Sequence, residues 1–137
     1  MELPDAHGTP VALTSAVAPL LVVFLPVAFS PVCGQEAREL AAAVAHGALG
    51  VDVVGVSCDS MFALRAWAQA EDLGFPLLSD FWPHGQVARS FGVLDERTGL
   101  PLRASFLLAG GRVRWRVINP SGTPRSLAGY HEAIAAL

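Results

Sequence analysis

Cysteine is scarce in this sequence: only Cys33 and Cys58 occur in 137 residues. Two thiols cannot form the set of disulfides that holds many small secreted domains together. The N-terminus also lacks the charged and then apolar layout of a secretory signal peptide. We therefore expect both thiols to stay reduced, and we expect a cytoplasmic protein.

Long apolar runs and basic clusters are missing as well. No apolar stretch is long enough to cross a bilayer. Because 53% of the residues are nevertheless hydrophobic, we expect some of the apolar side chains to cover a subunit interface. The net charge is −3, which argues against nucleic acid as a partner. The four histidines have no metal-ligand spacing with the cysteines, so we expect no metal and no other cofactor.

The order of apolar and helical segments predicts one α/β domain over residues 1–137, with a mixed sheet. The expected elements, in chain order, are a hairpin over 2–13, a connector over 14–19, a strand over 20–25, a helix from Ser30 to about 46, a strand over 51–57, a helix capped by Asp59 and ending before 74, a strand over 76–78, a helix over 86–91, a hairpin over 104–117 and a last helix from Thr123.

The stretch over 20–40 carries the clearest chemical signal. Its buried strand ends at Pro26, and Ser30 followed by Pro31 is a typical helix start. Cys33 then falls in the first helical turn, where free N–H groups and the helix dipole favour an anion. A thiol in such a position ionises more readily than a free one, and the thiolate is the nucleophile. A buried structural thiol is the alternative interpretation.

The same residues carry a resemblance to a known family. Pro26, Ser30 and Cys33 fit P-x-x-x-T/S-x-x-C, the active-site pattern of the peroxiredoxins. The segments L-S-D-F-W-P-H-G over 78–85 and R-A-S-F over 103–106 also match, in the same order. The chain is similar to the one-cysteine subgroup named after alkyl hydroperoxide reductase E. This resemblance implies a thioredoxin-like fold, a central mixed β-sheet flanked by helices.

The resemblance also implies roles for particular residues. Arg103 would face Cys33, since its guanidinium can hold a thiolate and orient a peroxide. The Ser30 hydroxyl would contact the sulfur and the peroxide, and Pro26 would shield the sulfur from water. Glu36 would lie near the active arginine. Ordinary solvated side chains are expected at the other arginines considered, namely Arg38, Arg65, Arg89, Arg97 and Arg125.

These assignments predict a thiol-dependent peroxidase that reduces hydrogen peroxide and alkyl hydroperoxides. Cys33 would become a sulfenic acid and be recycled by an external thiol, or by a thioredoxin-like or glutaredoxin-like protein. The resemblance further suggests a homodimer. A non-enzymatic redox sensor stays open as an alternative. A thioredoxin-type disulfide oxidoreductase is disfavoured, because Glu36 stands where the second cysteine of C-x-x-C would be.

Cys58 is a candidate resolving cysteine. It ends the second strand, so it should lie at the same sheet edge as Cys33. Neighbouring strands are about 4.8 Å apart and a disulfide needs Cα atoms within about 7 Å, so an internal bridge stays open if the first helical turn unwinds. Because position 38 is an arginine and the sequence ends without a further cysteine, we favour a one-cysteine mechanism.

Overall fold

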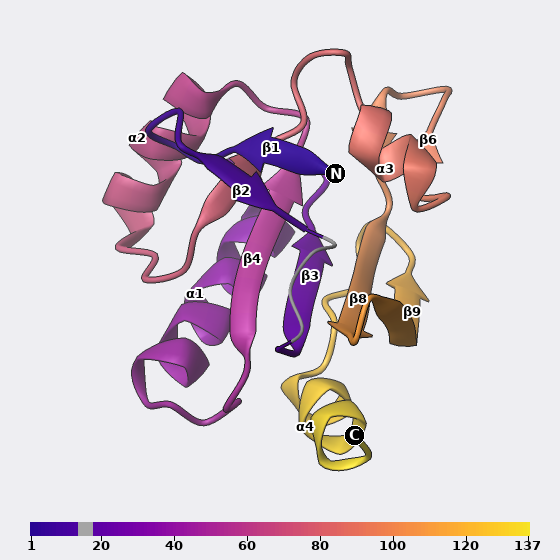
Figure 1. The fold of residues 1–137 in the computed structure, drawn as a ribbon. Coiled ribbons are helices and arrows are strands. Elements are labelled where there is room, and N and C mark those ends of the chain that lie inside the picture. The colour runs from indigo at the N-terminus through magenta and orange to yellow at the C-terminus, as the bar shows by residue number, and fades with distance from the viewer. Residues whose placement is uncertain (14–17) are drawn as a thin grey trace.

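The computed structural model describes residues 1–13 and 18–137 (Figure 1). The predicted connector over 14–19 falls mostly on residues 14–17, which lie outside the described residues. In chain order the elements are β1 (Glu2–Pro4), β2 (Pro10–Ala12), β3 (Leu20–Phe24), α1 (Pro31–Ala45), β4 (Asp52–Ser57), α2 (Met61–Glu71), β5 (Leu77–Ser79), α3 (Gln86–Ser90), β6 (Leu94–Asp95), β7 (Leu100–Pro101), β8 (Arg103–Ala109), β9 (Arg112–Asn119) and α4 (Leu127–Ala135).

A five-stranded mixed sheet in the order β5-β4-β3-β8-β9 forms the centre of the molecule. Strand β3 pairs in parallel with β4 on one side and antiparallel with β8 on the other. Because β3 is central and covered on both faces, all five of its residues are buried. This explains why it appears in the sequence as an unbroken apolar run. The sheet flanked by helices confirms the predicted thioredoxin-like architecture.

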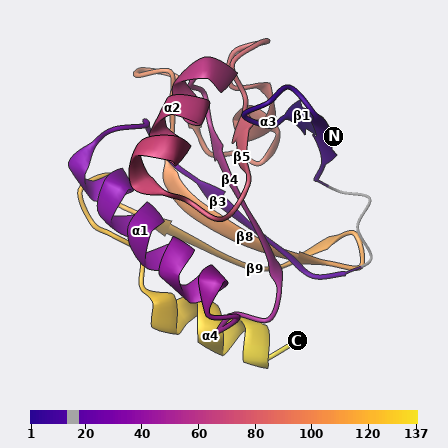
Figure 2. The same cartoon turned by 90° about the vertical axis from the view of Figure 1, so that its left-hand side faces the viewer.

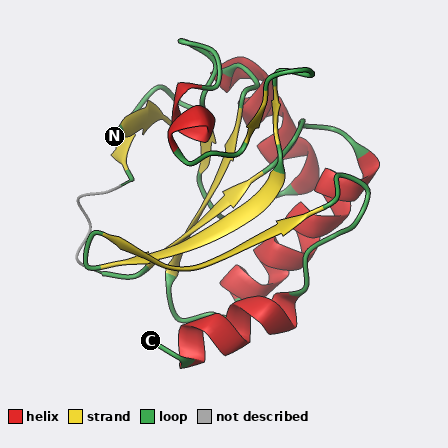
Figure 3. Ribbon diagram, turned by 90° about the vertical axis from the view of Figure 1, so that its right-hand side faces the viewer, coloured by secondary structure: helices red, strands yellow, loops and turns green. Residues whose placement is uncertain are grey.

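Each face of the sheet has its own core. Helices α1, α2 and α4 cover one face (Figure 2), where Trp67 and Tyr130 pack with the β3 side chain of Leu21. Helix α3 and the β1–β2 hairpin lie on the opposite face (Figure 3). There the rings of Phe24 and Phe106 meet edge to face, with centroids 5.9 Å apart. Both faces of the central sheet are therefore covered by packed side chains.

Two predicted helix starts are wrong. Helix α2 is capped by Ser60, whose hydroxyl accepts the Ala63 N–H at 3.2 Å, and not by Asp59. Helix α4 begins at Leu127, not at Thr123, with Ser126 as its N-cap. In the intervening loop, the Arg125 N–H donates to a Glu36 carboxylate oxygen at 2.6 Å.

The remaining elements agree with the prediction to within one or two residues. The β8–β9 turn has positive φ at both Gly110 (58°) and Gly111 (74°), the conformation that a tight hairpin needs. The small antiparallel ribbon of β6 and β7 was not predicted, since its strands have only two residues each. Among the described residues, no helix is both long and apolar enough to pass through a membrane.

Candidate active site

Cys33 lies where the sequence places it, at the third residue of α1. Ser30 is the N-cap and Pro31 is the first helical residue, which has no N–H to leave unbonded. The Gly34 N–H already donates to the Ser30 carbonyl at 2.8 Å. The Val32 and Cys33 N–H groups, which have no helical carbonyl four residues earlier, are thus the first-turn donors available to an anion. The Cys33 side chain is fully buried.

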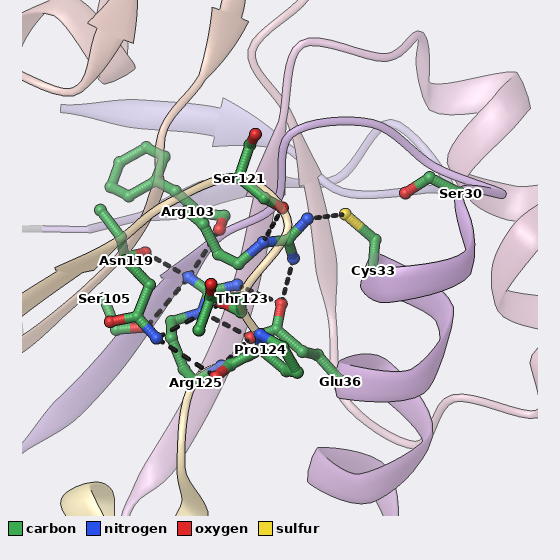
Figure 4. A network of polar contacts seen from close by, with 12 residues as sticks. Ser30, Cys33, Glu36, Arg103, Ser105, Asn119, Ser121, Thr123, Pro124 and Arg125 are labelled. Carbon is green, nitrogen blue, oxygen red and sulfur yellow. Dashed lines mark hydrogen bonds and ion pairs between the residues drawn. The ribbon is translucent and has the colours of Figure 1, made fainter.

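Arg103 is the cationic neighbour of this thiol (Figure 4). It is the first residue of β8 and is only 3% exposed. Its Nη2 donates to Cys33 Sγ at 3.4 Å, its Nε to the Ser121 carbonyl at 2.8 Å, and its Nη1 to Glu36 Oε1. The guanidinium is thus held in one orientation with one side directed at the sulfur.

Glu36 joins this arginine to a second one. One turn after Cys33 on α1, its carboxylate contacts both Arg103 and Arg125 while the residue is 8% exposed. Burial by itself would raise the pKa of Glu36, but the hydrogen bonds and charge of Arg125, with the charge of Arg103, hold it below the ordinary value. The carboxylate is therefore ionised at neutral pH and lies between two guanidinium groups.

Arg125 was expected in solvent, and this prediction is wrong. Its side chain is 1% exposed, and Nε and Nη2 each donate to the Glu36 carboxylate at 2.9 Å. Its Nη1 donates to the carbonyls of Phe24 (2.7 Å) and Ala104 (2.6 Å) and to Ser105 Oγ (3.2 Å). One side chain thus links α1, β3, β8 and the loop before α4.

Ser30 and Pro26 flank the cysteine loop without touching the arginines. The Ser30 hydroxyl donates to the Val27 carbonyl at 3.0 Å and makes no capping bond to α1. Figure 4 shows Ser30 at the start of α1, on the side of Cys33 away from Arg103. Pro26 is buried and follows β3 by two residues. The structure therefore brings Cys33 and Arg103 together and leaves Ser30 with a bond inside its own loop.

Phe29 has an unusual backbone in this loop. Its φ is +68°, a left-handed conformation that non-glycine residues rarely adopt, and its side chain is 59% exposed. Such a conformation costs about 1–3 kcal/mol and persists only where neighbouring contacts enforce it. Its ring lies 6.4 Å from that of Trp67 on α2. The loop before Cys33 therefore needs external support to keep its shape.

Cys58 follows β4 directly and lies, as predicted, at the same carboxyl edge of the sheet as the Cys33 loop. It is buried, and both cysteines are free thiols. Burial, with the nearby charges of Asp80 and Asp59, raises the pKa of Cys58 to about 12. Since thiolate is the attacking species in disulfide formation, Cys58 is poorly suited to that reaction at neutral pH.

Other residues from the resembling segments have structural contacts. The Asp80 carboxylate accepts the N–H groups of Val87 (3.1 Å) and Ala88 (2.8 Å) at the start of α3. His84 Nε2 is 2.6 Å from the Gly99 carbonyl. Residues 1–13 and 18–137 contain no group of three His, Cys, Asp or Glu side chains that could hold a metal ion.

Known proteins resemble this chain in sequence and in overall fold. The sequence model of the AhpC/TSA family matches residues 1–116. Alkyl hydroperoxide reductase E of Mycobacterium tuberculosis is 32% identical over 120 residues, which cover 86% of this chain and 78% of that protein. The crystal structure of Enterococcus faecalis AhpC superposes with a TM-score of 0.88 at 32% identity, covering 99% of this chain and 86% of that one. Peroxidoxin BcpB of Mycobacterium tuberculosis superposes with a TM-score of 0.86 at 27% identity, over 100% and 92% of the two chains.

Proposed function

This chain belongs to the AhpC/TSA family, the peroxiredoxins, which are thiol-dependent peroxidases, and from that premise we propose that Cys33 is its peroxide-reducing nucleophile, with Arg103 as its catalytic partner. The observation that carries the proposal is the 3.4 Å contact between Arg103 Nη2 and Cys33 Sγ at the start of α1. A guanidinium and a helix N-terminus both stabilise a thiolate.

The reaction follows from this arrangement. The Cys33 thiolate attacks the terminal oxygen of hydrogen peroxide or an alkyl hydroperoxide, so that an S–O bond forms and the O–O bond breaks. The sulfur loses two electrons and becomes sulfenic acid, while the leaving oxygen takes up a proton and departs as water or alcohol. Arg103 and the first-turn N–H groups stabilise the negative charge that moves onto the leaving oxygen. Pro26 and Ser30 shape the loop beside the sulfur.

We assign recycling to an external thiol in a one-cysteine mechanism. A first reductant thiolate attacks the sulfenic acid to form a mixed disulfide and water, and a second thiol releases Cys33. The burial of Cys58 and its pKa of about 12 support this assignment over an internal bridge. The reductant is a low-molecular-weight thiol or a thioredoxin-like or glutaredoxin-like protein in a reducing, cytoplasmic setting.

The test of the nucleophile is Cys33→Ser, which keeps the size of the side chain but removes an ionisable thiol. We expect the variant to fold and to lose peroxide consumption with every donor in a panel of thiols. Turnover close to that of the parent would refute the assignment. Stopped-flow mixing separates fast turnover with added thiol, expected of a peroxidase, from slow stoichiometric oxidation, expected of a sensor.

The test of recycling uses one equivalent of peroxide, a sulfenic-acid trap and intact mass measurement. We expect one trapped adduct on Cys33, with the same yield in Cys58→Ser. A loss of two mass units that disappears in Cys58→Ser would show an internal disulfide and overturn the one-cysteine mechanism.

We further propose a homodimer that forms through an aromatic patch, defined here as Phe62, Phe81 and Trp82. These side chains are 66%, 54% and 82% exposed and line one groove. Exposed aromatic groups gathered in this way typically mark an interface. One edge strand of the sheet, β9, carries Arg112, Arg114 and Arg116, so its charge repels a second copy of the same strand.

A further inference from the structure

The loop between β3 and α1 is tied to the end of β4 at two points. The Leu25 N–H donates to the Val56 carbonyl at 2.8 Å, which extends the parallel pairing one residue past β3. Three residues later, the Ala28 N–H donates to Asp59 Oδ2 at 2.9 Å. The second tie is made by a side chain, so a single substitution can remove it.

Asp59 is itself held firmly. The Ser57 hydroxyl donates to the same Oδ2 at 2.8 Å, and the Asp59 N–H donates back to Ser57 Oγ at 3.2 Å. The Ser79 hydroxyl, at the end of β5, donates to the Asp59 carbonyl at 2.6 Å. The carboxylate oxygen that receives the Ala28 N–H is therefore fixed to the carboxyl edge of the sheet.

The tied loop leads directly into the site. Ala28 is followed by Phe29, with its left-handed φ of +68°, and then by Ser30, the N-cap of α1. A left-handed conformation at a phenylalanine persists only where its surroundings impose it. The bond from the Ala28 N–H to Asp59 fixes the residue before Phe29. The bond from Ser30 Oγ to the Val27 carbonyl fixes the residue after it. Without the bond from Ala28 to Asp59, the loop and the first turn of α1 are no longer fixed relative to the sheet.

We propose that Asp59 is a positioning residue for peroxide reduction. Through the Ala28 N–H it holds the loop before α1, and thereby keeps Cys33 aligned with Arg103, which is anchored separately on β8. Asp59 does not touch the sulfur or the substrate. The inference rests on the proposed role of Cys33, and it gives Asp59 a function other than the helix capping predicted from sequence.

The experiment compares Asp59→Ala with Asp59→Asn. Both remove the charge, but only the asparagine keeps an oxygen that can accept the Ala28 N–H. We expect the rate constant for sulfenic acid formation with hydrogen peroxide to fall at least about tenfold in Asp59→Ala, as misplaced reacting groups do. We expect the same rate constant in Asp59→Asn to stay within about threefold of the parent value. Ser60→Ala removes the neighbouring cap of α2 and should leave the rate constant unchanged.

Near-ultraviolet circular dichroism, to which the buried Trp67 contributes, reports whether native packing is kept. An unchanged spectrum beside a slow peroxide reaction in Asp59→Ala supports positioning. A parent-like peroxide rate in Asp59→Ala, an asparagine variant as slow as the alanine variant, or a loss of rate that accompanies a loss of the near-ultraviolet signal would each overturn it. If Asp59→Ala does not fold, Ser57→Ala decides: a peroxide rate lowered at least about threefold relative to Ser60→Ala supports the proposal, and equal rates refute it.

These outcomes are separate from a failure of the proposed function. A Cys33→Ser variant that still consumes peroxide refutes the role of Cys33. An inactive Cys33→Ser beside fully active Asp59 variants refutes only the role of Asp59.

Discussion

Arg103 is the proposed catalytic partner of Cys33, and its side chain is held by three bonds. Its guanidinium divides its donors among a sulfur, a carboxylate and a backbone carbonyl, which belong to α1 and to the loop after β9. Because these partners come from separate parts of the chain, the group cannot turn away from Cys33 without breaking other bonds. A preorganised charge of this kind needs little rearrangement as the reaction proceeds.

Arg103→Ala should lower the rate constant for peroxide reduction at least about 100-fold, the scale of losing one preorganised donor. The sulfur also loses its cationic hydrogen-bond donor, so alkylation of Cys33 at pH 7 should become slower. Stopped-flow peroxide reduction and timed alkylation at pH 7 measure the two effects.

Arg97→Ala is the matched control for this prediction. The Arg97 side chain is 84% exposed, and its 3.9 Å contact with Asp95 lies on the surface. We expect both measurements to stay at parent values in this variant. If Arg103→Ala behaves in the same way, Arg103 has no part in the reaction.

Single residues differ in how far the sequence reveals their roles. Cys33 could be predicted because its signal is local: a hydroxyl, a proline and a thiol at the start of a helix. Arg103 could be selected only through the resemblance, because nothing beside it in the sequence marks it out. Arg125 was missed, since its burial results from α1, β3 and β8 converging around it, and sequence neighbours carry no trace of that.

Among the elements, α1 has a special place because Glu36 connects it to both buried arginines. The carboxylate has a lowered pKa, so it contributes stability that is complete above its ordinary value of 4.5. That contribution is lost as the pH falls through the lower, folded-state value. The ion pairs that Glu36 on α1 makes with Arg103 on β8 and with Arg125 in the loop before α4 therefore weaken in acid.

Glu36→Gln should reduce the free energy of unfolding at pH 7 by about 3 kcal/mol, because it leaves two buried guanidinium groups without a counter-charge. The difference from the parent should begin to shrink below pH 4.5, where the unfolded parent takes up a proton on Glu36, and should vanish below the lower pKa at which the folded parent does so. Urea unfolding from pH 7 to pH 3 measures it.

Glu96→Gln provides the comparison, since Glu96 pairs with Arg89 on the surface at 2.8 Å. Its removal should leave the free energy of unfolding close to that of the parent, because an exposed ion pair contributes little to stability. An equal loss of stability in the two variants at pH 7 would mean that the buried position of Glu36 has no special effect.

The elements themselves were largely predictable, because apolar strands and amphipathic helices follow from local pattern. The errors fall where two adjacent residues compete for one role. Asp59 and Ser60 are both good N-caps, and the path of the chain out of β4 decides between them. Thr123 and Pro124 resemble a helix start, but Ser126 is the N-cap of α4, and its hydroxyl accepts the Ala128 N–H at 3.1 Å.

At the scale of the whole molecule, its surface has two regions of opposite character. The aromatic patch offers apolar area on one side, and strand β9 offers a row of arginines at the sheet edge. A two-fold contact places each surface against itself, which favours the patch and disfavours the edge. The proposed dimer therefore depends on charge as well as on apolar area.

Trp82→Glu should convert the dimer to monomer, because it puts a charge at the centre of the aromatic patch. Sedimentation equilibrium should then give the 14.4 kDa chain mass for the variant and twice that mass for the parent. Val113→Glu, a matched change on exposed β9, should stay dimeric. A monomeric parent, or a dimer lost only in Val113→Glu, would contradict the proposed interface.

The buried cluster of one carboxylate and two guanidinium groups has a consequence for the reaction cycle. Glu36 balances only one of Arg103 and Arg125, so this cluster carries one surplus positive charge. A Cys33 thiolate cancels that surplus, whereas an uncharged sulfenic acid leaves it uncancelled in a region of low dielectric. The oxidised protein is thus one negative charge short, and an incoming reductant thiolate supplies it. Chloride should compete for this charge and slow the recycling step while leaving the oxidation step unaffected.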